Sequence, residues 1–311
     1  MKKIITTITL LTALNAQESY TDKLIRYHQS VSEWLTQNID YIDRYLSGTN
    51  SKKPNHSQVD ISFTLIPGSD GSFDTDYGFS LNLDMPRFSN RLHLLFNQIE
   101  DNWKGTKGST PPQLHNDIYD KSREKNYNFG FKYNKIQTDK LSFDLTGGVR
   151  FSKNFFEPYI GLIVTKNLLR KNKTTIDFTN EAKLYIGGEL QNVSTLERVY
   201  NIDEKSLFSS SLSLGYSSNS NDQSLLLSSN YFYAIDNNRY INSGALISST
   251  LTQFKSPKAN QYKIFTQYRD NLLHKKWLYY KVTPSVQWKR ENNFHASYHL
   301  GITLGMKFGK N

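Results

Sequence analysis

From residue 59 onward, apolar side chains recur at every second position, which is the period of a β-strand with one apolar face. The longest example is FHASYHLGITLGMKF (294–308), in which every second residue from the first is apolar or aromatic and the others are polar or glycine. Short polar turns such as GSDGS, IQTDK and SNSNDQ separate the apolar rows. The pattern predicts fourteen strands, with twelve as the alternative count, at 58–67, 73–84, 90–100, 127–136, 140–151, 157–168, 174–187, 192–202, 206–217, 223–234, 239–252, 260–270, 276–288 and 294–308.

The period is different before residue 48. Over 19–47 the apolar residues recur at three- and four-residue steps, which predicts an amphipathic helix about 40 Å long. The polar stretch SGTNSKKPNHS then ends the helix. The first residues, MKKIITTITLLTALNA, have two lysines, an apolar run and small residues at the end, which is typical of a secretory signal peptide cleaved after Ala16.

These patterns divide the chain into four parts. We expect a signal peptide (1–16), an amphipathic helix that is periplasmic or plugs the barrel (17–50), a linker (51–57) and a β-barrel (58–309). No window other than the signal peptide approaches the roughly 18 apolar residues that a membrane helix requires.

Strand length favours a membrane barrel over a soluble sandwich. Sandwich strands average about five or six residues, whereas ten to fifteen residues cross a hydrocarbon layer of about 25–30 Å at a tilt. Trp277, Trp288, Tyr298 and Phe308 lie near strand ends, as in the aromatic girdles at lipid–water interfaces. We therefore predict an all-β, transmembrane, antiparallel up-and-down barrel, closed so that no strand edge is unpaired.

Composition excludes several classes of protein. The formal net charge is +10 and the pI about 9.4, but Lys and Arg are scattered along the chain, so we expect no nucleic-acid partner. The chain has no Cys, which excludes disulfides, thiolate metal sites, cysteine nucleophiles and a lipoprotein anchor.

The positions between the apolar rows face the predicted lumen. The last three strands supply Lys263, Gln267, Arg269, Tyr279, Lys281, Lys289, His295, His299 and Lys307, with no acid among them. The first strands and the fifth supply Asp60, Asp76, Asp84 and Asp144, with Arg91 and Lys132 interspersed. This distribution predicts a positive wall beside a mixed, partly acidic one, and hence a transverse field that tunes ion selectivity. The alternative is that the charges pair across a polar interior and have no role in transport.

The C-terminal third carries a family resemblance. The stretches YRDNLLHKKWLYYKVTPSVQWKRENNF (268–294) and LGITLGMKFG (300–309) resemble the end of a group of uncharacterised, porin-like proteobacterial outer-membrane β-barrels. The segments SEWL and IDRYLSG (32–48) are similar to the N-terminal helix of that group. The resemblance implies an integral protein of a Gram-negative outer membrane, in contact with lipid and lipopolysaccharide and inserted by the barrel-insertion machinery. It implies no catalytic residue and no cofactor.

Three groups of residues could form an enzyme, metal or phosphate site, but a polar lumen or ordinary turns and loops explain them better. His295, Ser297 and His299 share one strand face, where a His–Ser pair would form a nucleophile, but no phospholipase motif accompanies them. Asp70 and Asp74, with Asp76, lie near a turn where oxygen ligands would suit calcium, without EF-hand spacing. GTKGST (105–110) lacks the strand–loop–helix context of a phosphate loop. We expect no catalytic site, cofactor or metal.

The expected activity is passive passage of small polar solutes through an outer-membrane barrel. The alternatives are a structural or envelope-assembly barrel without flux, and a lipid-modifying enzyme. A periplasmic partner of the N-terminal helix is a further expectation.

Overall fold

The computed structural model describes residues 2–48, 55, 57–84, 92–98, 127–138, 140–151, 156–218, 222–252 and 258–309, and the side chains from Thr21 onward except beside the gaps. Expectations that concern the side chains of 1–16, Arg91 and GTKGST lie outside the described residues.

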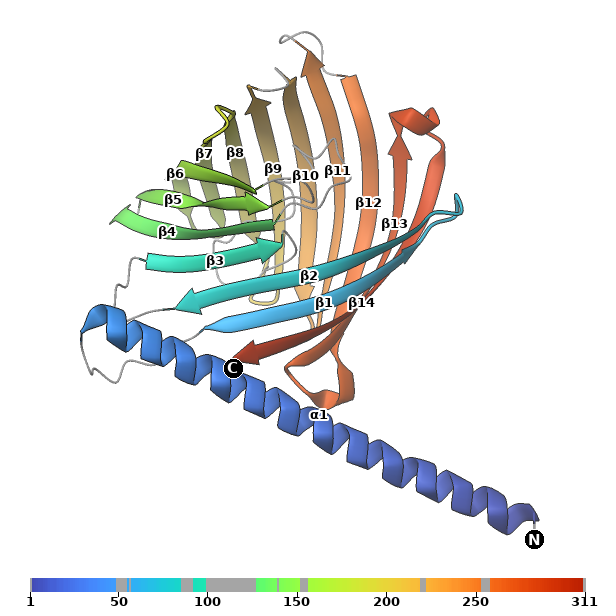
Figure 1. The fold of residues 1–311 in the computed structure, drawn as a ribbon. Helices are drawn as coiled ribbons and strands as arrows, with labels where there is room; N and C mark the ends of the chain where they lie inside the picture. Colours follow the sequence, from blue (N-terminus) through green and yellow to red (C-terminus); the bar gives the residue numbers. More distant parts are fainter. Residues whose placement is uncertain are drawn as a thin grey trace.

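The chain forms one long helix followed by β-strands (Figure 1). Helix α1 spans Lys2–Ser47, so the backbone is helical well before the predicted start at 19. The strands are β1 Gln58–Pro67, β2 Phe73–Asp84, β3 Leu92–Gln98, β4 Tyr127–Gln137, β5 Leu141–Phe151, β6 Phe156–Lys171, β7 Thr174–Tyr185, β8 Leu190–Asn201, β9 Ser206–Ser217, β10 Asp222–Ala234, β11 Tyr240–Thr252, β12 Lys258–Asn271, β13 Leu278–Lys289 and β14 Ala296–Gly309.

Every strand pairs antiparallel with its neighbours in sequence, and β1 pairs with β14, which closes the sheet into a barrel. The closing pair runs from Gln58 opposite Gly309 to Leu65 opposite Ile302. We call the end of the barrel that carries Gln58 and Gly309 the terminal rim, and the end that carries Pro67 and Ala296 the distal rim.

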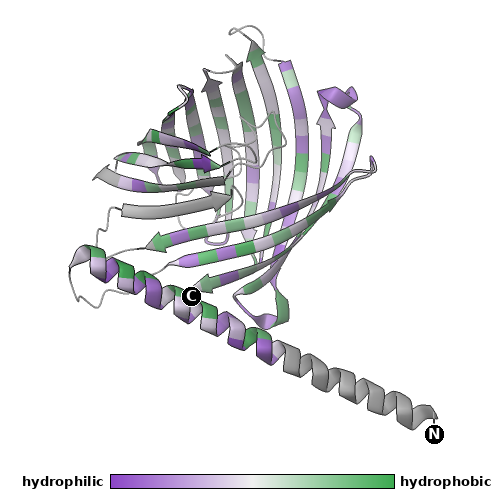
Figure 2. Cartoon of the chain, in the orientation of Figure 1, coloured by the Kyte–Doolittle hydropathy of each residue, from purple (hydrophilic) through white to green (hydrophobic). Residues whose placement is uncertain are grey.

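The alternating pattern places apolar side chains on the outside of the barrel. Figure 2 shows apolar and polar bands alternating along the strands, and Ile61, Ile302 and Leu304 are 45%, 41% and 51% exposed. The alternate residues face inward and include shielded polar side chains such as Ser213 and Lys281, 1% and 5% exposed, together with apolar ones such as Leu226 and Val193. An apolar outer surface around a polar interior is the reverse of a soluble domain and is typical of membrane barrels.

The seam between β1 and β14 is held by side chains as well as by backbone. The hydroxyls of Thr64 and Thr303, both buried on the lumen side, are hydrogen-bonded at 2.8 Å. On the terminal side of this pair, Gly305 leaves room for the ring of Tyr279, because a Cβ at residue 305 would lie 2.1 Å from that ring. Overpacking of this kind forces neighbouring side chains to shift, so glycine is needed at this position.

The described part of α1 lies against the outside of the terminal rim (Figure 1). His28 stacks on Trp277 with ring centroids 4.0 Å apart, and its Nε2 lies 2.7 Å from the carbonyl oxygen of Lys307. Leu35 and Ile39 pack against residues of β1, β2 and β14 that face outward. Of the residues that the structure describes, no helix is long and apolar enough to cross a membrane.

Two aspartates brace the tight turns at the terminal rim. Asp203 accepts hydrogen bonds from the backbone N–H groups of Lys205 and Ser206, and Asp236 accepts them from Asn238 and Arg239. The pKa of each aspartate is lowered, and the main reason is the hydrogen bond that its carboxylate accepts from a backbone N–H group. Such turns join neighbouring strands with few residues.

Replacing Thr303 by Val should destabilise the seam, because the buried Thr64 hydroxyl then loses its partner. We expect the free energy of unfolding in urea, measured on the lipid-reconstituted protein, to fall by about 1–3 kcal/mol. The double variant Thr64→Val/Thr303→Val is the control and should recover much of the loss, since both polar groups are then removed. A double variant less stable than the single one would contradict this account of the seam.

Candidate functional site

The barrel interior is the candidate site, and its walls differ in charge. On β12 to β14 the inward side chains include Lys263, Arg269, Lys281, Lys289 and Lys307. The strand β6 lies seven places around the ring from β13, so the wall formed by β5 to β8 faces this basic wall across the lumen.

The basic wall converges on Tyr279, which is 2% exposed near the terminal rim. Its hydroxyl donates a hydrogen bond of 2.6 Å to Asp60 Oδ1 across the lumen face of the seam. The Arg269 guanidinium carbon lies 4.1 Å from the centre of the Tyr279 ring, and the ammonium nitrogens of Lys281 and Lys307 lie at 5.7 and 5.9 Å. These are cation–π distances, so a single ring holds three positive groups around one carboxylate.

Arg269 lies in this cluster between aromatic rings. Within the described residues, no carboxylate bonds to its guanidinium, which is flanked by the rings of Tyr279 and, at 5.8 Å, Tyr240. The Nε–H group of Arg269 is buried and donates to no partner among the same residues. Because the cluster holds three cations and the single carboxylate of Asp60, it keeps an excess of positive charge, and Arg269 is a candidate for contact with an anion.

The facing wall is mixed, with more acids than bases. Lys132 pairs with the buried Asp144 at 2.8 Å, and Lys183 pairs with Glu181 at 2.7 Å. Asp177 accepts a hydrogen bond of 2.6 Å from the Asn167 amide. The inward acids on β5 to β8 and the β7–β8 turn include Asp144, Glu157, Asp177, Glu181, Glu189 and Glu197, and the bases in the inward register of the same strands include Arg150, Arg170 and Lys183.

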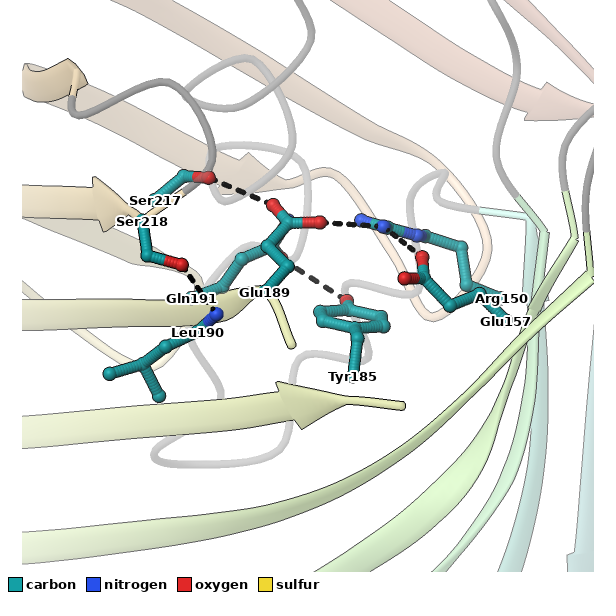
Figure 3. Close-up of polar contacts among 8 residues, drawn as sticks. All are labelled: Arg150, Glu157, Tyr185, Glu189, Leu190, Gln191, Ser217 and Ser218. Carbon is teal, nitrogen blue, oxygen red and sulfur yellow. Dashed lines mark hydrogen bonds and ion pairs between the residues drawn. The ribbon is translucent and has the colours of Figure 1, made fainter. Parts of the chain in front are cut away.

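A polar network links three hairpins at the distal rim (Figure 3). Arg150 bridges Glu157 and Glu189, the latter at 2.8 Å, and its guanidinium carbon lies 3.9 Å from the centre of the Tyr185 ring. The other oxygen of Glu189 accepts hydrogen bonds from Gln191 at 2.7 Å and from Ser217 at 2.8 Å. Strands β5 to β9 are thus joined through one carboxylate.

Glu189 lies in the β7–β8 turn, where opposing effects act on its carboxyl. Burial alone would raise the pKa of Glu189, but the hydrogen bonds from Arg150, Gln191 and Ser217 outweigh it and lower the pKa below its ordinary value. The carboxylate therefore stays ionised, and the network stays assembled, through the neutral range.

The structure places most of the lumen residues singled out by the sequence on the inward face. Lys281 and Asp60 meet at the Tyr279 cluster with Arg269, whereas Lys263 and Lys289 lie nearer the distal rim, the latter 3.5 Å from Glu291. His299 faces inward and contacts the Gln287 amide. Asp76 and Asp144 also face inward, and the side chain of Asp84 lies outside the described residues.

His295 is the exception among the lumen candidates. It is exposed in the β13–β14 turn, before the first residue of β14, so it does not line the strand wall. The physical reason is that Asn293 and Phe294 adopt positive φ angles of 51° and 59°, which ends the strand geometry on which the alternation depends.

The acids of β6 to β8 were missed in the sequence. The available signal was alternation, because these acids stand at the inward-facing positions of their strands, as the predicted lumen residues do. They are Glu157, Asp177, Glu181 and Glu197. Outward Asn180, Asn192 and Ser194 obscure that signal, because polar residues on both faces weaken the alternation.

Among the described residues, no contact supports the enzyme or the calcium hypothesis. Ser297 faces the lumen, and among the described residues neither His295 nor His299 bonds to it. Within the same residues no three His, Cys, Asp or Glu side chains gather as metal ligands, and Asp70 instead accepts the backbone N–H of Ser72.

Comparison with solved structures identifies the architecture. Outer-membrane expressed OmpT of Vibrio cholerae matches with a TM-score of 0.51 and 8% identity, over 82% of this chain and 97% of that one. The fold is that of an outer-membrane β-barrel protein. The outer membrane channel DcaP of Acinetobacter baumannii (TM-score 0.46, 8% identity, 82% and 96% covered) and OprD of Pseudomonas aeruginosa (0.44, 7%, 82% and 95%) also match. No protein-family model and no curated protein matches the chain.

The distal network should make stability depend on acidity. Because the pKa of Glu189 is lowered by folding, its contribution is present above about pH 4.5 and is lost as the pH falls through the folded value. We expect Glu189→Gln to lower the free energy of unfolding by about 1.5–3 kcal/mol at neutral pH and to flatten the acid limb of the stability profile.

Glu204→Gln, in an exposed turn, is the matched control and should leave both quantities unchanged. Urea titrations at a series of pH values measure the effect. An acid limb identical in wild type and Glu189→Gln would contradict the assignment.

Proposed function

We propose that the protein is an integral outer-membrane barrel, closed by fourteen strands, exported by its N-terminal signal and serving as a porin-like channel for small polar solutes. The proposal joins an apolar outer surface, a polar and charged interior, and the fold shared with an outer-membrane protein. The observation that carries it is the opposition of a basic wall on β12 to β14 to the more acidic wall on β5 to β8.

The excess of positive charge around Tyr279 favours a conducting interior over a packed one. In a barrel with a tightly packed interior, burying a cation without an ion-pair partner would cost free energy. An aqueous lumen removes that cost, because water and passing anions solvate the guanidinium. Opposed charged walls then create a transverse field that orients polar solutes.

Strand number is consistent with a narrow channel. Barrels of about eight strands have interiors filled by side chains, whereas about sixteen to eighteen strands leave a wide aqueous pore. Fourteen strands lie between these limits. The solutes that fit this width are small, polar and charged or dipolar.

Conductance across planar bilayers tests the channel, and charge variants test the walls. Arg269→Gln should shift the reversal potential in a salt gradient toward cation selectivity, because it removes an unpaired cation from the lumen. Glu181→Gln on the facing wall should shift it in the opposite direction. Stable steps with identical reversal potentials in all three proteins would refute the proposed field, and the absence of steps would favour a structural or envelope-assembly barrel.

Removing residues 17–50 separates a plug from an external helix. The described contacts of α1 are with the outside of the terminal rim, so we expect single-channel conductance to be the same with and without this segment. The full-length protein recorded in the same lipid is the control. A larger conductance after deletion would show that the segment obstructs the lumen.

A further inference from the structure

One side of α1 docks on the barrel wall. Leu35 and Ile39, 8% and 4% exposed, pack against Val59, Leu83 and Phe308. These three partners belong to the outward-facing rows of β1, β2 and β14. The helix therefore covers the start of the same apolar surface that surrounds the barrel.

A second side of α1 is bonded to the rim itself. The Ser32 hydroxyl accepts a hydrogen bond from the backbone N–H of Gly309, the last residue of β14. The Asn55 amide, just before β1, donates to the carbonyl oxygen of Thr36 and to the Asp40 carboxylate, both at 3.2 Å. These bonds fix how the helix is rotated about its axis.

A third side of α1 is exposed and rich in aromatic rings. We call Tyr27, Val31, Trp34, Asn38, Tyr41 and Tyr45 the aromatic stripe. Tyr27, Trp34, Tyr41 and Tyr45 are 72%, 63%, 65% and 77% exposed. Four such side chains exposed on one helix face form an interaction surface.

The rotation of the helix determines where this stripe points. At about 100° per residue, the stripe follows Leu35 and Ile39 on the side remote from Thr36 and Asp40. Passing around the helix from the rim bonds, one meets the wall contact and then the stripe. The stripe therefore lies on the side of the helix opposite the rim bonds and points along the outer wall of the barrel, away from the terminal rim.

The remaining side of the helix is hydrophilic. Arg26, Glu33, Gln37 and Arg44 lie between the rim-bonded side and the stripe on the far side of the axis, and all four are exposed. The helix thus has a charged side and an aromatic side in addition to the side that packs on the barrel.

We propose that the aromatic stripe lies in the headgroup region of the lipid leaflet at the terminal rim, so that α1 is an interfacial collar on the barrel. This inference rests on the proposed membrane location of the barrel. Tyr and Trp place an apolar ring toward the acyl chains and a polar tip toward headgroups, which is why they concentrate at this depth. An amphipathic helix with one aromatic and one charged side is the form that lies along a bilayer surface.

The composition of the stripe favours lipid over a second copy of the chain. A dry helix–helix interface would bury the hydroxyls of Tyr27, Tyr41 and Tyr45, each at a cost unless paired. Headgroups and interfacial water satisfy those groups without fixed geometry. Continuity with the apolar outer wall at Val59 and Phe308 supplies the apolar half of the same surface.

Single spin labels test the collar, since the chain has no native Cys. Tyr41→Cys reports the stripe, Glu33→Cys, about 80° around the helix axis from it, reports the charged side, and Leu304→Cys reports the outer wall of β14. Each variant of the full chain is labelled with a nitroxide and reconstituted into vesicles of phosphatidylethanolamine and phosphatidylglycerol. Collisions with oxygen and with a water-soluble nickel chelate are measured by electron paramagnetic resonance.

We expect the label at residue 41 to collide several-fold less with nickel than the label at residue 33, and to resemble the label at residue 304 in its contact with oxygen. Equal nickel access at residues 41 and 33 would overturn the collar. Spin–spin broadening at residue 41 that disappears on dilution with unlabelled protein would instead assign the stripe to a second copy. Nickel access at residue 304 would refute the membrane barrel itself, so the two failures are distinguishable.

Discussion

The pairing of β1 with β14 is the constraint on which the other features depend. In a hydrocarbon environment an unpaired backbone N–H or C=O costs several kcal/mol, so a sheet survives there only without edges. Residues 58–65 meet residues 302–309 in register, and the Thr64–Thr303 hydrogen bond repeats that register on the lumen side. The two strands are separated by most of the chain. Their pairing closes the ring, and closure gives the sheet an inner face and an outer face.

Closure converts a simple alternation into two chemically different surfaces. Outward residues become a belt of exposed apolar side chains, and inward residues become a lumen in which charges are held close together. The same closure brings Asp60 of β1 to Tyr279 of β13, and with it the cations of β12 to β14. At the distal rim, the Glu189 carboxylate bonds to Arg150 of β5 and to Ser217 of β9. The proposed transverse field therefore follows from topology, because β6 and β13 are opposite only in a closed ring.

The helix is attached at the place where the ring closes. His28 stacks on Trp277 beside β13 and meets the backbone of β14, while Asn55 connects the helix to the approach of β1. Contacts with both sides of the seam tie the N-terminal segment to the closing strands. As a proposed interfacial collar, α1 would also set the depth of that rim in the lipid.

Much of the architecture was determined by the sequence, because strand alternation is a local property. Rows such as 58–67 and 73–84 coincide with β1 and β2, and the predicted row 192–202 corresponds to β8 at Leu190–Asn201. Parity within a row also gave the inward face of Lys281 and Asp144. Three features depended on the tertiary structure. They are the positive φ angles that put His295 in a turn, the gathering of Arg269, Lys281 and Asp60 around Tyr279, and the side of the barrel on which α1 lies. The turn around His295 is set by local hydrogen bonds such as that from Phe294 N–H to the Lys289 carbonyl oxygen, which a periodic pattern does not report. The other two features depend on contacts between residues far apart in the chain, because a periodic pattern reports which face a residue occupies but not which residues share that face across the ring.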